Sequence, residues 1–283
     1  MDIELLRTFL EVVRTRHFGK AAAELCVTQS AVSARIRQLE QTLAKPLFVR
    51  HRNNIQLTAE GRQLRKHAET IVQVWSRARQ ETGLGTDYTR ALAIGAIQDL
   101  WATLLAGWLP ALRDQMPDTA LQVETGTTDG LVRKLLDSVI DLAILFEPPQ
   151  VPALELRELA VINLVLASTR QGQTPDQALG PGYIMVDWGT AFALHHARHY
   201  PNMLAPALHM NQGILARQHL QQVLGAAYLP EQMLDKNPAG RPLYRVTSAA
   251  VIERPVYGVF ATGNDRADTI RQALGLLPGH HPR

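Results

Sequence analysis

The sequence predicts an N-terminal all-α segment with a small two-stranded wing, followed by a longer α/β segment. Three observations predict this division. Apolar residues recur every three or four positions up to Thr82, which is typical of amphipathic helices. From Arg90 onward, short apolar runs alternate with helical patterns, which is typical of α/β domains. A flexible break from Gly83 to Asp87 separates the two patterns, and 283 residues are enough for about two domains.

The charges divide the chain in the same way. Residues 1–81 carry 14 Lys and Arg against 8 Asp and Glu, whereas residues 82–283 carry 15 against 18. Because nucleic-acid phosphates are neutralised by clustered Lys and Arg, a basic segment at one end is typical of a nucleic-acid-binding module. A solvated helical surface explains the same charge, and the charge alone leaves both interpretations open.

The composition argues against a disordered chain, a disulfide scaffold and a membrane protein. Hydrophobic residues make up 46% of the chain and charged residues 19%, which is ordinary for a packed globular protein. Cys26 is the single cysteine, so no disulfide forms within the chain. Glu4, Arg7 and Glu11 interrupt the start of the chain, and no run approaches the ~18 apolar residues of a membrane span. We therefore expect a soluble protein of a reducing compartment, the cytoplasm.

Helix signals and a tight connection predict a winged helix-turn-helix over residues 1–58. Asp2 and Thr28 are placed to cap two helices, and Pro46 ends the second of these. The turn former Asn53-Asn54 separates two wing strands. Small alanines allow the paired helices to approach closely, as the motif requires. The expected elements are a helix carrying Leu6, Phe9, Leu10 and Val13, a short helix carrying Ala21, Ala22 and Leu25, a helix from Thr28 to Thr42, and strands at 47–50 and 55–57.

A long helix from Thr58 to Thr82 carries an apolar seam. Its apolar residues alternate between spacings of four and three, which suits a partner helix. The helix would extend roughly 36 Å at 1.5 Å per residue. A core helix of a single globule is the alternative interpretation. The seam residues, expected to mediate dimerisation, are Leu64, Ala68, Ile71, Trp75 and Ala78.

The region from residue 90 to 279 predicts an α/β domain. Its strands are nearly continuous apolar runs, and strand–helix–strand order with such strands implies a mainly parallel sheet covered on both faces. The expected strands lie at 91–97, 121–124, 140–146, 164–167, 183–186, 207–210, 226–229 and 256–261, and the expected helices at 100–115, 130–136, 191–199, 213–222 and 265–277.

The helix from Thr28 to Thr42 presents a face suited to the major groove of DNA. Its small, polar and cationic residues project opposite the apolar residues Val32, Ile36 and Leu39. Arg pairs with guanine edges, Gln with adenine, Ser with phosphate and Ala with the thymine methyl, while a basic wing grips the flanking backbone or minor groove. A polar, solvent-facing helix is the alternative. The candidate DNA-binding residues are Gln29, Ser30, Ser33, Ala34, Arg35, Arg37, Arg50, Arg52 and Asn53.

Three strand-to-helix turns in the α/β segment are candidates for a ligand site. Free amides at helix N-termini bind carboxylates or phosphates, although polar residues there are also ordinary helix caps. The turns bring Asp99, Asp129 and Asp187 with no Lys or Arg beside them, so a neutral or amine-bearing ligand against Trp188 fits better than a di-acid. The candidate effector-binding residues are Gln98, Asp99, Leu100, Thr127, Thr128, Asp129, Asp187 and Trp188.

Signals for an enzyme or a metal site are weak. Cys26 lies in the helix-turn-helix connection without a base beside it and is best explained as a buried small apolar residue. His195 and His199 share a helical face, but no acid in a metal-ligand pattern accompanies them. Gly83-x-Gly85 lacks a third spaced glycine, and the chain contains no Gly-x-Ser-x-Gly or Walker-type loop. We therefore expect no catalytic residue, metal or cofactor.

The N-terminal motifs closely resemble the DNA-binding domain of LysR-type transcriptional regulators. They span residues 2–61 in order, and residues 140–144 resemble the family's effector domain more loosely. Residues 50–54 and 187–189 resemble the HdfR-like branch of the family. Many members have Arg where this chain has Ala34, so base readout would pass to Arg35 or Arg37, and a glycine is usual where it has Ser138. The matching motifs are Leu5-Leu6-x-x-Phe9, Phe18-Gly19-Lys20-Ala21-Ala22, Val27-Thr28-Gln29-Ser30-Ala31-Val32-Ser33, Ile36-x-x-Leu39-Glu40, Leu47-Phe48-x-Arg50 and Leu57-Thr58-x-x-Gly61.

The resemblance implies a cytoplasmic transcription factor that regulates bacterial promoters and is not an enzyme. Its partners would be double-stranded promoter DNA, a small-molecule effector, further copies of the chain in a dimer or tetramer, and RNA polymerase. A small-molecule-binding protein without DNA activity is the main alternative, and a hydrolase or transferase comes third. The implied domains are a winged helix-turn-helix (1–58), a dimerising linker helix (59–82), a hinge (83–89) and an effector domain (90–279) of two periplasmic-binding-protein-like α/β lobes, lobe I at 90–160 plus 263–279 and lobe II at 161–262.

Overall fold

The computed structural model describes residues 2–51, 54–85, 87–234 and 240–277. The chain forms two compact units. The N-terminal unit comprises Met1–Gly85 with Asp137–Val139, and the C-terminal unit comprises Thr86–Leu136 with Ile140–Arg283. The division after Gly85 falls within the predicted hinge at 83–89.

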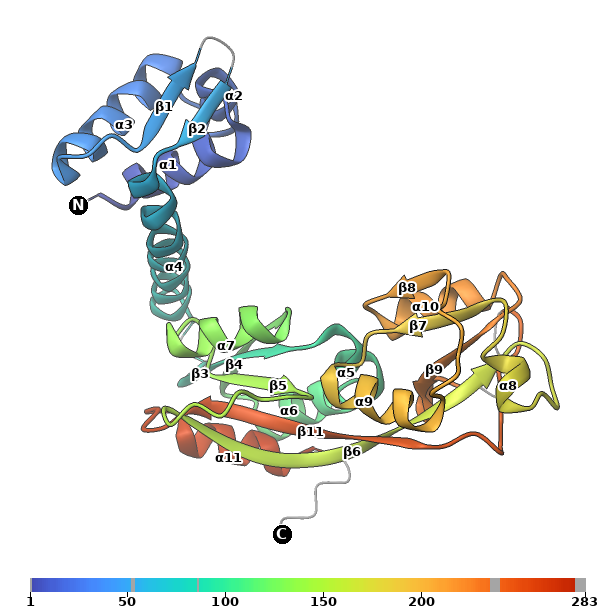
Figure 1. Ribbon diagram of the computed structural model, residues 1–283. Coiled ribbons are helices and arrows are strands. Elements are labelled where there is room, and N and C mark those ends of the chain that lie inside the picture. Colours follow the sequence, from blue (N-terminus) through green and yellow to red (C-terminus); the bar gives the residue numbers. More distant parts are fainter. Residues whose placement is uncertain (1, 52–53, 86, 235–239, 278–283) are drawn as a thin grey trace. The chain divides into compact units, whose positions relative to one another are not determined.

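The N-terminal unit has the expected order of helices and wing strands (Figure 1). Asp2 accepts a hydrogen bond from the Glu4 amide at 3.0 Å, and Thr28 accepts one from the Ala31 amide at 3.2 Å, so both predicted caps are confirmed. The wing turn differs slightly from the expectation, because Asn54 pairs with His51 inside the second strand. The elements are α1 (Ile3–Thr15), α2 (Phe18–Glu24), α3 (Gln29–Leu43), β1 (Phe48–His51), β2 (Asn54–Leu57) and α4 (Ala59–Thr82).

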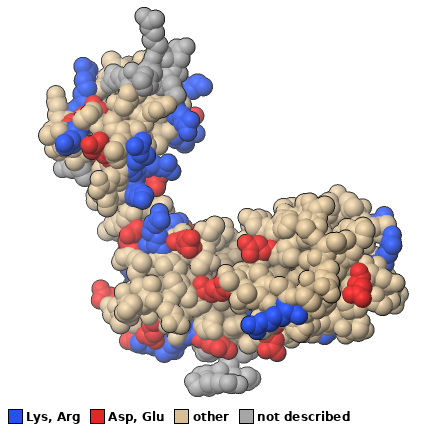
Figure 2. Space-filling model, in the orientation of Figure 1, with Lys and Arg blue, Asp and Glu red and all other residues tan. Residues whose placement is uncertain are grey.

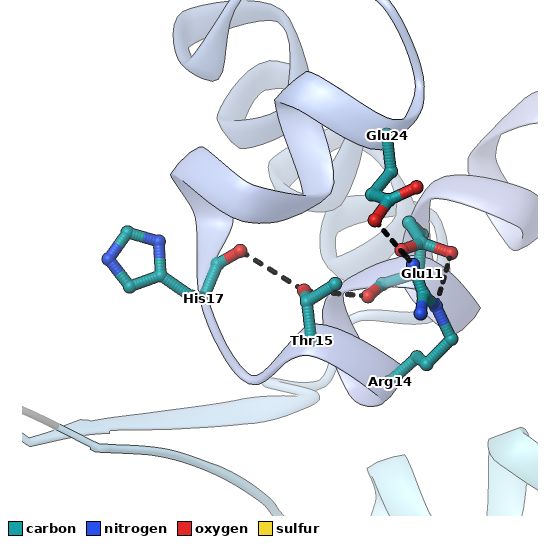
Figure 3. A network of polar contacts seen from close by, with 5 residues as sticks. All are labelled: Glu11, Arg14, Thr15, His17 and Glu24. Carbon is teal, nitrogen blue, oxygen red and sulfur yellow. Dashed lines mark hydrogen bonds and ion pairs between the residues drawn. The ribbon is translucent and has the colours of Figure 1, made fainter.

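A polar network at the end of α1 fixes the short helix α2 (Figure 3). Arg14 Nη2 lies 2.7 Å from Glu11 Oε1 on its own helix and 3.1 Å from Glu24 Oε1 on α2. The Thr15 hydroxyl contacts the carbonyls of Glu11 and His17 at 2.8 and 3.1 Å. The His17 ring points away from the ion pairs, and its Nδ1 accepts from the amides of Gly19 and Lys20 at the start of α2. Because exposed ion pairs contribute little to stability, the network orients α2 more than it stabilises it.

The connection between α2 and α3 corrects the expectation for Cys26. The residue is exposed rather than buried, and its backbone has a φ of 54°, in the left-handed region. The turn therefore holds a residue other than glycine in a conformation that few side chains adopt without strain.

Helix α4 uses its apolar seam in two ways. Ala68 is fully buried, and Leu64 packs against the same core as α1 and α3. Further along, Ile71, Val74 and Trp75 are 39, 39 and 47% exposed. The first part of the predicted seam thus packs within its own unit, and the second part is an uncovered apolar face.

The C-terminal unit is built on a nine-stranded sheet, counted over the described residues, with helices packed around it (Figure 1). The order of the main path is β4-β3-β5-β11-β6-β9-β7-β8, with β10 paired to β6. The strands are β3 (Arg90–Ala96), β4 (Thr119–Thr125), β5 (Leu142–Leu145), β6 (Leu154–Ser168), β7 (Tyr183–Val186), β8 (Leu208–Met210), β9 (Ala226–Pro230), β10 (Tyr244–Arg245) and β11 (Ile252–Ala261). The helices are α5 (Gln98–Thr103), α6 (Trp108–Gln115), α7 (Thr128–Leu136), α8 (Pro175–Ala178), α9 (Thr190–His199), α10 (Gly213–Leu220) and α11 (Ala267–Gly275), with a 3-10 turn, η1 (Glu231–Met233).

The prediction of a mainly parallel sheet was wrong. β3 is parallel to β4 and β5, and β7 is parallel to β8 and β9, but β6 and β11 run antiparallel to each other and to their other neighbours. These two long strands run along the length of the unit (Figure 1). Continuous apolar runs report burial on both faces and not strand direction, which is why the pattern misled. The expected lobe boundary between residues 160 and 161 falls inside β6.

The single helix predicted at 100–115 is two helices, α5 and α6. Pro110 is the cause, because it has no amide hydrogen to donate to the preceding turn and clashes with that turn inside a helix. It is tolerated in the first turn of α6, where the amide would have no partner within the helix. The short elements α8, η1 and β10 were not anticipated.

Within the described residues, no helix combines the length and the apolar character that crossing a membrane requires.

Candidate functional site

The first candidate site is the exposed face of α3. Val32, Ile36 and Leu39 are fully buried against the core of the N-terminal unit. This packing leaves the opposite side of the helix free, as the spacing predicted. The exposed residues there are Gln29, Ser30, Ala34, Arg37, Gln38 and Gln41, while Ser33 and Arg35 are half-buried.

The two arginines of this face, Arg35 and Arg37, differ in how their side chains are held by other residues. Arg35 Nη1 donates to the hydroxyl of Thr8 on α1 at 3.3 Å, which draws its guanidinium toward the neighbouring helix. Among the described residues, the partner of Arg37 Nε is the carbonyl of Ser33, one turn back on the same helix, at 3.3 Å. Arg37 is therefore the cation that projects from the face, whereas Arg35 also serves the packing of α3 on α1.

The candidate DNA-binding residues of the wing cannot be placed in the same way. Arg52 and Asn53 lie outside the described residues, and the side chain of Arg50 is also outside them. In the space-filling view, blue Lys and Arg atoms are frequent on the visible face of the N-terminal unit (Figure 2). This agrees with the excess of basic residues in the first part of the sequence.

The second candidate site is a cavity of about 460 Å³ inside the C-terminal unit. It opens where β3, β4, β5, β7 and β8 end, which is the usual place for a ligand in an α/β fold. All three predicted turns contribute to its wall, with Gln98, Asp99, Thr127, Thr128, Asp187 and Trp188. Two predicted residues do not: Leu100 is fully buried in the core, and Asp129 is exposed outside the lining.

Asp99 caps a helix that is distant in the sequence. Its Oδ2 accepts from the Gly213 amide at 2.9 Å and its Oδ1 from the Ile214 amide at 3.0 Å, at the start of α10. Burial raises the pKa of Asp99, and the two amide hydrogen bonds only partly oppose this. The carboxylate thus joins the turn after β3 to the turn after β8, with both of its oxygens occupied.

Glu147 makes the equivalent link to α9. Its Oε1 and Oε2 accept from the amides of Ala191 and Thr190 at 2.9 and 3.2 Å. Oε1 also lies 2.9 Å from Nη2 of Arg254, which comes from the long strand β11. Burial acts to raise the pKa of Glu147, but the amide hydrogen bonds and the charge of Arg254 outweigh it, and the pKa is lowered.

Aromatic side chains pack one side of the cavity. The Arg254 guanidinium lies over the Phe146 ring at 5.4 Å, and Phe146 meets Trp188 edge-on at 6.1 Å. Trp188 is buried, and its indole donates to the Tyr228 carbonyl at 2.9 Å. A Cβ on Gly213 would lie 2.4 Å from the indole, so the glycine is required for this close approach.

Glu147 and Arg254 were not predicted from the sequence, and the cavity that contains Asp99 and Asp187 also contains this cation, contrary to the expectation. Arg254 is 2% exposed and lies far along the chain from the three turns. No local signal pointed to Arg254, because it stands between Glu253 and Pro255, ahead of the strand expected at 256–261. The other missed wall residues include Asn211 and Gln212.

Comparisons with known proteins agree with this arrangement. The model of the bacterial regulatory helix-turn-helix protein, lysR family, matches residues 3–62, and the LysR substrate binding domain matches residues 86–280. The chain therefore belongs to the LysR family of transcriptional regulators, with a DNA-binding helix-turn-helix and an effector-binding domain.

Within that family the chain is similar to HdfR. It is 38% identical over 283 residues to the HTH-type transcriptional regulator HdfR of Yersinia pestis (strain Pestoides F), covering 97% of this chain and 95% of that protein. HdfR of Yersinia pseudotuberculosis serotype O:1b (strain IP 31758) gives the same values. The predicted resemblance to the HdfR-like branch is thus confirmed.

Solved structures share the fold. The crystal structure of CbnR, a LysR family transcriptional regulator, has a TM-score of 0.80 at 17% identity, over 97% of this chain and 98% of that one. Full-length CbnR complexed with its target DNA has a TM-score of 0.76 at 19% identity, over 98% and 99%.

Proposed function

We propose that this regulator reads promoter DNA with the exposed face of α3 and responds to a small molecule held in the cavity of the C-terminal unit. The observation that carries the first half is the division of α3 into two faces. Val32, Ile36 and Leu39 are fully buried, so the helix is held rigidly by one side. Gln29 and Arg37 project from the other side, where they are free to meet base edges.

The proposal assigns base readout to Arg37 first. Its guanidinium is exposed and makes only a local contact, whereas Arg35 is tied to Thr8. Ala34 has no polar group, so no cation stands at that position. Ser33 and Ser30 supply hydroxyls for phosphate or base contacts, and the predicted roles of Arg50, Arg52 and Asn53 on the wing remain part of the proposal.

The test is the affinity of the full chain for a DNA fragment that it binds, at fixed salt concentration. Arg37→Ala should cost about 1–3 kcal/mol of binding free energy if the contact is to a base edge. Arg113→Ala is the matched control, because Arg113 is an exposed arginine on α6 of the C-terminal unit. Unchanged affinity in both Arg37→Ala and Ser33→Ala would exclude this face as the reader. If the wild-type chain binds no DNA, a ligand-binding protein without DNA activity becomes the better interpretation.

We place the dimer contact on the uncovered face of α4. Ile71 and Trp75 were predicted for it, and Val74 lies beside them with similar exposure. Three large apolar side chains within five positions form a patch that a partner helix would cover. The roles of Leu64 and Ala68 are internal to the unit in this proposal, and Ala78 lies at the edge of the patch.

The cavity is the proposed effector site. Asp99 and Glu147 reach from the turns after β3 and β5 to the N-termini of α10 and α9. A ligand between them would therefore contact both pairs of hydrogen-bonded segments. The ligand would change promoter occupancy only by binding one arrangement of the C-terminal unit better than another. The proposal further places the protein in the cytoplasm as a dimer or as a tetramer assembled from two dimers, with promoter DNA and RNA polymerase as partners and no catalytic role.

A further inference from the structure

Arg254 has more hydrogen-bond donors than the protein satisfies. Its side chain is 2% exposed and lines the cavity. Nη2 lies 2.9 Å from Glu147 Oε1, whereas Nε is buried and has no hydrogen-bonding partner among the described residues. A guanidinium carries five N–H donors and no acceptor, and among the described residues neither Nε nor Nη2 of this one makes a hydrogen bond of good geometry, although Nη2 is ion-paired with Glu147. A buried donor without a partner is costly, and the cavity is the place from which a partner would come.

The neighbouring acids do not supply that partner. Both oxygens of Asp99 accept from the amides of Gly213 and Ile214. Glu147 divides its oxygens between two amides at the start of α9 and the single contact to Nη2 of Arg254. Asp187 is exposed and accepts from the Gly189 amide at 2.9 Å. The unsatisfied donors therefore require an acceptor from outside the chain.

The walls restrict the charge of that acceptor. Arg254 is the one Lys or Arg among the described residues that line the cavity, and the remaining polar groups are neutral side chains or the three acids. One planar guanidinium matches one carboxylate, which accepts two parallel hydrogen bonds from it. A second carboxylate on the ligand would face Asp99 and Asp187 with no cation to balance it.

Resting on the proposed function, we propose that the effector carries a single carboxylate, which accepts hydrogen bonds from Arg254 inside the cavity while its uncharged body lies against Phe146 and Trp188. This replaces the expectation of a neutral or amine-bearing ligand, which assumed that no cation was present. The expectation that a di-acid is disfavoured is kept, with a different reason. The aromatic wall suits an apolar body, and the cavity of about 460 Å³ is in the size range of ordinary ligand sites.

The experiment measures binding of matched acids, amides and di-acids to the full chain, by calorimetry and by the shift in Tm, at constant pH and ionic strength. The probes are hexanoate, hexanamide and hexanedioate, and phenylacetate, phenylacetamide and 1,4-phenylenediacetate. Each amide keeps the shape of its acid and loses the charge. We expect at least one monocarboxylate to bind and raise Tm, with its amide and its di-acid at least tenfold weaker.

Two substitutions move the affinity in opposite directions. Arg254→Lys keeps the charge beside Glu147 and loses the planar fork, so the affinity for the bound monocarboxylate should fall at least tenfold. Glu147→Gln keeps an oxygen to cap α9 and removes a competing carboxylate, so the affinity should rise. Arg157→Lys is the control, because Arg157 is a partly exposed arginine of β6 outside the lining. The wild-type comparison of acid with amide stands even if a variant fails to fold.

Four results would overturn the proposal: no monocarboxylate binds, an amide binds as tightly as its acid, a di-acid binds more tightly than the monocarboxylate, or Arg254→Lys leaves the affinity unchanged. These outcomes are separate from the DNA-binding test. A chain that retards no DNA but binds a monocarboxylate through Arg254 refutes the proposed function and leaves this site standing. A chain that binds DNA through Arg37 but binds amides more tightly than their acids supports the proposed function and refutes the carboxylate site.

Discussion

Replacing His196 should remove a large part of the acid sensitivity of the C-terminal unit. His196 lies on α9 and is 2% exposed. Its Nε2 is 2.9 Å from the Tyr183 hydroxyl, its ring stacks on that of Tyr183 at 5.7 Å, and it meets the Tyr228 ring edge-on. Burial, with a smaller contribution from the charge of His199, lowers the pKa of His196 to about 4 from its ordinary 6.5.

The sign follows from the direction of this shift. A histidine whose folded pKa is lowered contributes stability that is fully present above its unfolded pKa of 6.5 and is lost as the pH falls through the folded pKa of about 4. The difference between the two values, at 1.36 kcal/mol per unit, gives at most about 3 kcal/mol. Between pH 7 and pH 4.5 the wild type should lose more than about 2 kcal/mol from this group alone.

The assay is urea unfolding of the full chain at pH 7, 5.5 and 4.5. The variant is Tyr183→Phe with His196→Phe, since replacing both partners leaves no buried hydroxyl without a hydrogen bond. Its free energy of unfolding should fall less with acid than that of the wild type, by the amount given above. The control is His195→Gln, because His195 is exposed on the same helix.

Parallel pH dependences of the wild type and the double variant would refute this reasoning. They would mean that His196 is already protonated in the folded protein at pH 7, or that water reaches the packed rings of His196, Tyr183 and Tyr228. A change in the His195→Gln control of the same size would also contradict it.

Two further predictions concern the N-terminal unit. Trp75→Ala should shift the full chain toward monomer in sedimentation velocity at low micromolar concentration, because truncating an aromatic residue that is buried in the dimer interface costs several kcal/mol. Leu194→Ala is the control, because Leu194 is an exposed apolar residue of α9, and a Trp75→Ala chain that stays dimeric would place the contact elsewhere. Gly61→Ala should lower the unfolding free energy by more than 1 kcal/mol, on the order expected for overpacking, because its Cβ would lie 2.2 Å from the Leu47 carbonyl oxygen, and wild-type stability would contradict that packing.

The N-terminal unit followed closely from the sequence because its signals are local. Asp2 and Thr28 cap the helices that follow them, and apolar spacing over a few turns identified the buried side of α3. The resemblance pointed to Gly61 without explaining it, and its contact with the Leu47 carbonyl gives the physical reason. Ser138, where a glycine is usual in the family, has a φ of 55°, so that turn does need left-handed backbone.

The cavity was only half predictable. Turns that follow strands can be recognised in the sequence by their Asp, Thr and Gly residues, and Asp99 and Trp188 were predicted in this way. Arg254 lies in the part of β11 that precedes the strand expected at 256–261, so no sequence pattern indicated its burial or its role. Its meeting with Glu147 depends on the antiparallel course of β11, which no local pattern specifies. Because local patterns do not specify strand direction, the sheet was also wrongly predicted to be mainly parallel.

Selection of bound sequences from a pool of random double-stranded DNA tests the central claim most directly. The account predicts that the full chain enriches a motif of two inverted half-sites about one helical turn apart or a multiple of it, as a two-fold dimer requires. It also predicts that Arg37→Ala relaxes the preference at defined positions of each half-site, while Arg113→Ala enriches the wild-type motif. Failure of the wild-type chain to enrich any sequence, or an unchanged motif with Arg37→Ala, would contradict the account.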